Sequence, residues 1–259
     1  MSSFFYKNLD KLVDKNMKTT TYLLSVIDRL PKGYVFSYTD FEVETTKKEA
    51  VIKALNRMVQ SGKLRKLSKG KFYKPETSIF GQLQPKQLQI VKDLLEEQGK
   101  IIGYLTGYSV FPQLGLTTQV SHTLQIGRAD SRPTFKRERY TISFIKQKNT
   151  ITKENIPLLQ LLDALRYIKK IPDTTLDASI RRFLALLKDF EDADLKKITR
   201  LALKYPPSTR ALLGALLDEL NKEEFTKSLF ESLNPITTYT YSEGGAVEVL
   251  NTTKKWNIQ

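Results

Sequence analysis

Basic and amide side chains recur through residues 46–75 in a pattern that suits contact with nucleic acid. The first group lies on one face of a predicted helix and comprises Lys47, Lys48, Lys53, Asn56, Arg57 and Gln60. In the major groove, Asn and Gln amides can pair bidentately with adenine, and Lys or Arg with guanine. The second group lies on a predicted hairpin and comprises Arg65, Lys66, Lys69 and Lys71. We predict that both groups bind DNA; the competing interpretation is a solvated basic helix beside an ordinary hairpin.

A capped helix is expected to position the first group. Thr46 with Glu49 three positions on has the spacing of a capping box, and Gly62 follows where a helix can end. Apolar residues recur between them at helical spacing, at Ala50, Val51, Ala54, Leu55, Met58 and Val59. Two short extended runs, 64–67 and 72–73, then form the hairpin that carries the second group.

The segment before Thr46 supplies the other elements of a winged helix-turn-helix. A helix is predicted over residues 19–30, an extended run over 34–36 and a small helix over 37–41, and residues 1–16 could add a short helix. In this motif class the second helix enters the major groove. We therefore predict a winged helix-turn-helix domain over residues 1–80.

The charge distribution places nucleic-acid affinity in the first part of the chain. The net charge of the 259 residues is +14, and residues 1–80 hold 16 Lys or Arg against 8 acidic residues. Residues 153–259 hold 16 against 15 and are nearly neutral. Residues 81–152 hold 10 Lys or Arg against 5 acidic residues. Since phosphate contacts dominate affinity for DNA, the first 150 residues are the expected binding region.

Composition argues against several other classes of protein. The chain has no Cys, so no disulfide framework or thiolate metal site is expected, and its only histidine is His122. No apolar run approaches the length of a membrane span, and the N-terminus lacks a signal-peptide pattern. We expect a cytoplasmic, non-enzymatic protein with no metal, cofactor or membrane partner. A metal-dependent nuclease built on scattered Asp and Glu residues is the enzymatic alternative.

The remaining sequence predicts a mixed, mainly helical α+β domain with a small sheet over residues 81–234. A linker at 78–84 leads to a helix from Pro85, and strands are expected at 120–126 and 140–145. A basic loop lies between these strands, either solvated or a second nucleic-acid or partner contact, and contains Arg128, Arg132, Lys136, Arg137 and Arg139. Four apolar helical stripes follow, over 154–168, 176–190, 195–205 and 209–220. Residues 235–259 are expected to form a tail or hairpin.

Several short segments resemble the AbiEi family, the antitoxin half of a bacterial type IV toxin–antitoxin system. The resemblance covers roughly residues 20–220, and its more specific part is GYLTG at 103–107 with LGLTTQ at 114–119. The other matching segments are 29–36, 40–41, 54–58, 62–66, 69–75, 205–208 and 213–215.

The resemblance implies a function in phage defence and autoregulation. The winged domain would repress the antitoxin–toxin operon by binding inverted repeats in operator DNA. The C-terminal domain would counter a nucleotidyltransferase-like toxin without needing a stable complex. Two other classes remain open, a ligand-responsive winged-helix regulator without a toxin partner and an enzyme with a DNA-targeting domain.

Overall fold

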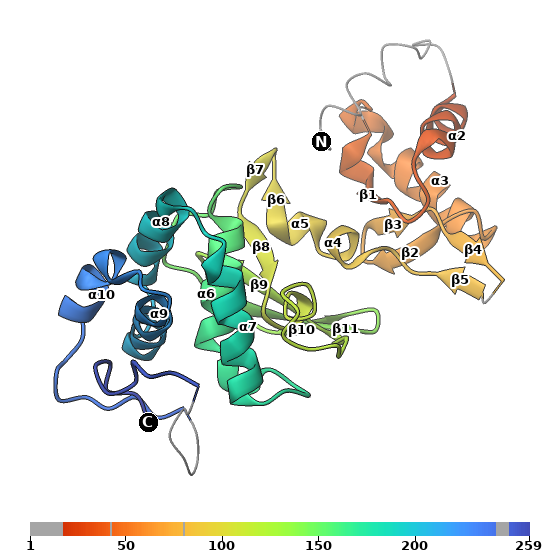
Figure 1. The fold of residues 1–259 in the computed structure, drawn as a ribbon. Coiled ribbons are helices and arrows are strands. Elements are labelled where there is room, and N and C mark those ends of the chain that lie inside the picture. The colour runs from red at the N-terminus through yellow and green to blue at the C-terminus, as the bar shows by residue number, and fades with distance from the viewer. Residues whose placement is uncertain (1–17, 42, 80, 242–248) are drawn as a thin grey trace. The chain divides into compact units, whose positions relative to one another are not determined.

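The computed structural model describes residues 18–41, 43–79, 81–241 and 249–259 (Figure 1). The chain forms two compact units. The first comprises the chain up to Lys100 together with Lys136–Tyr140, and the second comprises Ile101–Phe135 and the chain from Thr141 onward. The first unit thus extends beyond the boundary predicted at residue 80 and includes a short segment from later in the chain. The helix predicted at 1–16 lies outside the described residues.

The first unit begins with two helices that pack against each other beside a small antiparallel sheet of order β1-β3-β2. Its elements are α2 (Thr19–Arg29), β1 (Val35–Ser37), a 3-10 helix (Tyr38–Asp40), a second 3-10 helix (Thr45–Lys47), α3 (Lys48–Gln60), β2 (Arg65–Ser68) and β3 (Lys71–Tyr73). Apolar residues at helical spacing bury Leu23 and Ile27 of α2 against Val51 and Leu55 of α3. Gly62 follows α3 with a positive φ of 76°, as predicted.

The start of α3 differs from the sequence prediction. Thr46 lies inside the 3-10 helix, the residue preceding α3 is Lys47, and no side chain caps the helix. The Thr46–Glu49 capping box is therefore wrong, because the chain enters α3 through a tighter turn that leaves Thr46 out of the capping position. Ala50, assigned to the apolar stripe, is exposed.

The rest of the first unit is more irregular than predicted. The expected linker at 78–84 overlaps a hairpin that starts before it, β4 (Glu76–Ser78) with β5 (Gly81–Leu83). The single helix expected from Pro85 is two short helices, α4 (Gln87–Ile90) and α5 (Lys92–Leu95), because Val91 between them leaves the helical conformation at φ −110° and ψ 8°. Strands β6 (Glu96–Glu97) and β7 (Lys100–Ile101) follow.

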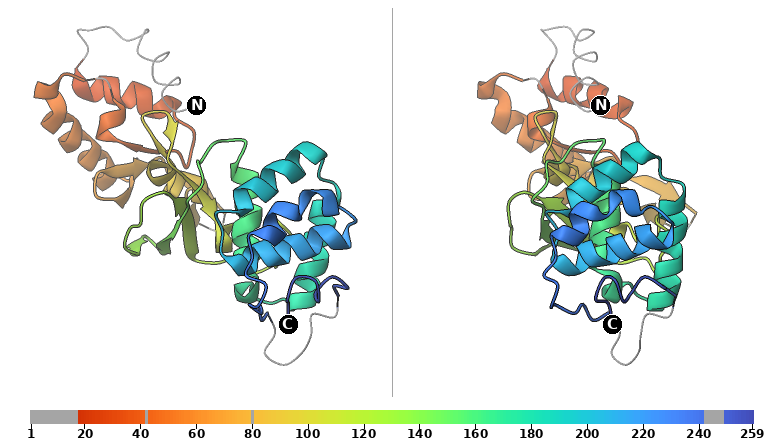
Figure 2. Two further views of the ribbon diagram at one scale, coloured as in Figure 1. Left: turned by 90° about the vertical axis from the view of Figure 1, so that its left-hand side faces the viewer. Right: turned by 60° about the vertical axis from the view of Figure 1, so that its left-hand side comes forward.

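The second unit combines a small sheet with a helical bundle. Strands β11 (Tyr140–Lys146), β9 (Thr123–Arg128) and β8 (Gly103–Thr106) lie side by side in that order, with β9 parallel to β11 and antiparallel to β8. Strand β10 (Phe135–Arg137) lies where the chain passes from the second unit into the first. The helices are α6 (Ile156–Arg166), α7 (Leu176–Lys188), α8 (Asp192–Ala202), α9 (Pro207–Glu219) and α10 (Lys227–Glu231). Figure 2 shows these helices gathered into one bundle.

The C-terminal segment packs into this bundle instead of forming a loose tail. The sole tryptophan, Trp256, is 1% exposed and its indole N–H donates to the carboxylate of Asp218 at 2.8 Å. Gly214 of α9 makes room for it, because a Cβ there would lie 2.1 Å from the indole ring. Leu250 and Ile258 are buried in the same core. The predicted mixed α+β class, with a mainly helical second part and a small sheet, is confirmed.

Candidate nucleic-acid interface

The exposed face of α3 carries most of the side chains predicted to bind DNA. Burial of Val51, Leu55 and Met58 turns the opposite face of the helix to solvent. That face and the neighbouring hairpin β2–β3 together expose Lys47, Lys48, Lys53, Asn56, Arg57, Arg65, Lys66 and Lys69, which we call the α3–hairpin face. These residues lie in one unit, so the structure presents them on a common scaffold.

Three residues of the α3–hairpin face, Lys47, Lys48 and Asn56, have side-chain contacts with other described residues. Lys47 lies 3.3 Å from Glu44 in an exposed ion pair, a contact that salt and solvent weaken. The ammonium of Lys48 lies 4.9 Å from the ring centre of Tyr38. Asn56 donates one amide hydrogen to the carbonyl of Ile52 at 3.0 Å, which leaves its second amide hydrogen and its oxygen for a base edge. No ion pair with a described carboxylate is formed by Lys53, Arg57, Arg65, Lys66 or Lys69.

The hairpin exposes its cations through an irregular register. A shift between Lys66 and Ser68 interrupts the pairing of β2 with β3. Leu67 is buried at this irregularity, while both Arg65 and Lys66 point to solvent. Gly70 has a positive φ of 74°, which suits the tight turn that displays Lys69. The hairpin therefore exposes three cations, Arg65, Lys66 and Lys69.

Lys71, the fourth hairpin cation in the prediction, is engaged inside the first unit. It pairs with Asp93 of α5, whose carboxylate also accepts two hydrogen bonds from Arg137 at 2.7 and 3.2 Å. Burial opposes ionisation of Asp93, yet the hydrogen bonds from Arg137 and Lys71 outweigh it and lower the pKa of the carboxyl. Lys71 is thus a structural ion-pair partner, and contact with DNA would require it to leave Asp93.

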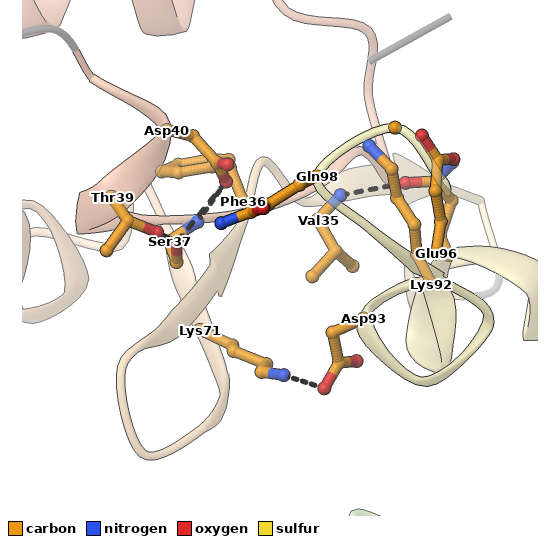
Figure 3. Close-up of a pocket in the computed structure, with 12 residues that line it drawn as sticks. Val35, Phe36, Ser37, Thr39, Asp40, Lys71, Lys92, Asp93, Glu96 and Gln98 are labelled. Atoms are coloured by element: carbon orange, nitrogen blue, oxygen red, sulfur yellow. Dashed lines mark hydrogen bonds and ion pairs between the residues drawn. The ribbon is translucent and has the colours of Figure 1, made fainter. Parts of the chain in front are cut away.

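A polar cavity of about 430 Å³ lies beside this ion pair in the first unit (Figure 3). The backbone N–H of Val35 donates to the side-chain oxygen of Gln89 at 3.2 Å, and Lys92 donates to the hydroxyl of Tyr34 at 2.8 Å. Lys71 and Asp93 approach each other across the lower part of Figure 3. These bonds fix α4 and α5 to β1, so the helices after residue 80 belong to the same folded body as α3.

The second predicted basic contact, Arg128, Arg132, Lys136, Arg137 and Arg139, is not one solvated loop. Arg128 is 6% exposed and Arg137 is 7% exposed, so neither is a surface cation. Arg128 and Arg132 both bind Asp130 at 2.7 Å, and hydrogen bonds from Arg132 and then Arg128 lower the pKa of this carboxyl to about 2. Lys136 and Arg139 are exposed but belong to the first unit, whereas Arg128 and Arg132 belong to the second.

Sequence reasoning missed a buried polar cluster in the second unit. Asp163 is 0% exposed, and its carboxylate accepts hydrogen bonds from Tyr104 at 2.7 Å, Thr106 at 2.8 Å and Tyr205 at 2.9 Å. Gln147 donates to both tyrosine hydroxyls at 2.8 Å. Burial raises the pKa of Asp163, although the hydroxyl donors oppose that rise. The sequence did show one sign of this cluster, because Asp163 interrupts the apolar run of α6. Its partners could not be identified, since they lie 42 to 59 positions away in sequence.

Metal chemistry finds no support within the segments that the structure describes. They hold no group of three or more His, Cys, Asp or Glu residues placed to bind a metal ion. His122 is exposed. Across the same segments, no helix is both long and apolar enough to cross a membrane.

The comparisons with known proteins give a family and a fold. The crystal structure of the RV2827C protein from Mycobacterium tuberculosis is similar with a TM-score of 0.60 and 12% identity, covering 95% of this chain and 92% of that one. At this identity the likeness concerns the fold alone. No curated protein matches the sequence. Residues 22–195, more than half of the chain, match the model of a family described as "Family of unknown function (DUF6088)". The chain therefore belongs to the DUF6088 family.

Proposed function

We propose that the protein binds double-stranded DNA through a winged helix-turn-helix in its first unit. In this proposal α3 is the recognition helix, inserted into the major groove, and the β2–β3 hairpin is the wing. The observation that carries the proposal is the α3–hairpin face, where cations and an Asn amide share one exposed surface with few carboxylate partners. The order of α2, the 3-10 helices, α3 and hairpin also follows that motif.

The proposal divides the α3–hairpin face into base-reading and phosphate-binding residues. Lys53 and Asn56 lie on the exposed side of α3, where a base edge can be reached, and Lys69 lies at the hairpin turn. Loss of a base contact costs specific binding roughly 1–3 kcal/mol, while loss of a phosphate contact weakens all duplexes alike. The two roles therefore predict different ratios of operator to random-DNA affinity.

The test is a footprint on the DNA upstream of the gene, followed by titrations of that duplex and of a random duplex. Asn56→Ala and Lys53→Ala should weaken operator binding more than random binding, and Lys69→Ala should weaken both equally. Lys32→Ala is the matched control, because Lys32 is an exposed lysine of the same unit outside the face. Equal behaviour of all four variants would refute the assigned recognition face.

On the resemblance to the AbiEi family, we further propose that this binding serves an antitoxin. The protein would repress its own operon at inverted repeats, and the second unit would counter a nucleotidyltransferase-like toxin. What supports separate roles is that basic, exposed residues concentrate in the first unit while the second has its own apolar core.

Co-expression with the toxin tests the division in the full chain. Replacing Lys53 and Asn56 with Ala together should abolish repression of a promoter reporter while colonies still survive toxin expression. Loss of both properties in this variant would show that protection acts through repression. A nucleotidyltransferase gene beside this one is the genetic observation that the antitoxin proposal requires.

A ligand-responsive regulator is the second candidate, and the cavity beside Asp93 is the observation that favours it. The cavity is lined by Lys71 of the hairpin and by Asp93, so a ligand competing for either would loosen the hairpin. Small-molecule sites commonly fall in this range of volume. A metabolite that changes operator affinity in the wild type but not in Asp93→Asn would favour this function over the antitoxin.

A further inference from the structure

The second unit contains a cavity of about 610 Å³ whose lining is basic without a single acidic side chain. It lies between the end of β11, the end of α6 and the loop from α8 to α9. The cationic lining residues are Lys146, Lys148, Arg166, Lys204 and Arg210. None of them forms an ion pair with a carboxylate of the described residues, whereas Arg128 and Arg132 of the same unit share Asp130.

Like charges gathered around one hollow repel each other, so this arrangement lowers stability unless an anion enters. A solvated lysine cluster on a convex surface escapes that repulsion by spreading into water. Here the residues converge from β11 and the loop after it, from α6, from the α8–α9 loop and from α9. Lys204 is held by a hydrogen bond from its ammonium to the carbonyl of Lys148 at 3.4 Å. The concave shape therefore concentrates positive potential at one place.

Arg210 brings a cation from α9 to the lining. Its Nη1 donates to the carbonyl of Ser232 at 3.0 Å, but its Nε is buried with no partner among the described residues. This Nε is shielded from solvent, so it does not face the cavity, and Arg210 contributes to the lining through the rest of its guanidinium. Arg210 also lies in the first turn of α9, where the helix dipole favours negative charge.

The back of the cavity is rigid and neutral. Gln147 and Tyr205 line it, and both belong to the hydrogen-bonded cluster around Asp163. Pro206, Pro207 and the exposed Leu203 form an apolar part of the rim. A ligand that matches this lining carries several negative charges and one flat or apolar portion.

We propose that this cavity binds a nucleoside di- or triphosphate. The phosphates would lie among the lysines and arginines, and the base would lie against Leu203 and the two prolines. The volume is within the range of small-molecule sites, about 300–1,000 Å³. The site is separate from the α3–hairpin face and does not depend on DNA binding by the first unit.

The test is calorimetric titration of the full chain with ATP, GTP, inorganic tripolyphosphate and adenosine at fixed salt. ATP or GTP should bind, tripolyphosphate more weakly and adenosine undetectably. Lys204→Gln and Lys146→Gln should each weaken nucleotide binding roughly tenfold, since charge-assisted bonds to phosphate are lost. Both residues are exposed, so the variants should fold.

Lys188→Gln is the matched control, an exposed lysine of α7 outside the cavity, and should bind nucleotide as the wild type does. Equal weakening in the control, or no binding of any nucleotide, would overturn the proposal. Tripolyphosphate binding as tightly as ATP would overturn the nucleoside assignment. Competition between operator duplex and ATP, lost in Lys204→Gln, would assign the cavity to the DNA backbone instead.

Discussion

Replacing Gly214 with alanine should destabilise the second unit through its only tryptophan. A Cβ at position 214 would lie 2.1, 2.3 and 2.4 Å from three ring atoms of Trp256, distances that non-bonded carbon atoms cannot keep. Gly214 is in the interior of α9 and Ala211 and Ala215 around it are fully buried, so the helix has little room to shift. The indole must therefore move.

The energetic cost follows from what holds the ring. Its N–H bond to Asp218 is worth about 1–3 kcal/mol, and its edge contact with Phe230, at 5.4 Å between ring centres, about 0.5–1.5 kcal/mol. Overpacking in cores commonly costs about 1–3 kcal/mol. Against these losses, alanine gains about 1 kcal/mol over glycine in a helix interior. We expect the free energy of unfolding to fall by about 2–6 kcal/mol.

Fluorescence reads this change directly because Trp256 is the sole tryptophan of the chain. The Gly214→Ala variant should shift its emission to longer wavelength and unfold at lower urea concentration, with circular dichroism following the same transition. In the background of Trp256→Leu, the same alanine should cost much less, since its clash partner is gone. Unchanged emission with stability raised by the helix-propensity gain would refute the packing argument.

Three further predictions concern the ions and hydroxyls of the two units. The logarithm of DNA affinity should fall against the logarithm of salt concentration with a slope of about −4 to −7, from about 4–8 phosphate contacts, and a slope near zero in duplex titrations would refute groove binding. The pKa of Asp93 is lowered in the folded state, so the ionised carboxylate stabilises the fold at pH values above the ordinary pKa near 3.8. This stabilisation is lost as the pH falls through the folded-state pKa. Thermal unfolding measured in acid should therefore depend less steeply on pH in Asp93→Asn than in the wild type. Tyr205→Phe removes a buried hydroxyl that donates to Asp163 and accepts a hydrogen bond from Gln147, so it should lower the free energy of unfolding by about 1–3 kcal/mol. The control is Tyr167→Phe, at a half-buried tyrosine that directly follows α6, and it should change the free energy of unfolding little.

Helices were predictable from the sequence where apolar residues at helical spacing pack against a single hydrophobic core. Val51, Leu55 and Met58 recur at helical spacing and are buried, and the stripes over α6 to α9 gave those helices to within a few residues. Thr46 shows the limit of local rules, because its capping pattern is present but the backbone takes a 3-10 turn there. A pattern that depends on one residue's conformation is easily displaced by the surrounding turn.

Side-chain partners distant in sequence were not predictable. Asp93 and Arg137 are 44 positions apart, so nothing local distinguishes Arg137 from the exposed cations near it. The same holds for Lys71, whose spacing along the hairpin fits a surface residue while the fold supplies an acid opposite it. Of the predicted site, the helix face depended on periodicity and could be placed, while the pairing of each cation depended on tertiary contacts.

The return of residues 136–140 to the first unit has a consequence for how such a protein can be recombined. A gene fusion that joined residues 1–100 to a different partner would leave Asp93 without Arg137, and the carbonyl of Ile90 would lose its donor at 2.6 Å. The rest of the chain would contain Arg137 without its carboxylate partner Asp93. The first unit therefore cannot be exchanged in this fold by a single crossover after Lys100. A working chimera has to inherit two separate stretches of the donor gene, and we expect single-crossover hybrids to be recovered mainly as insoluble protein.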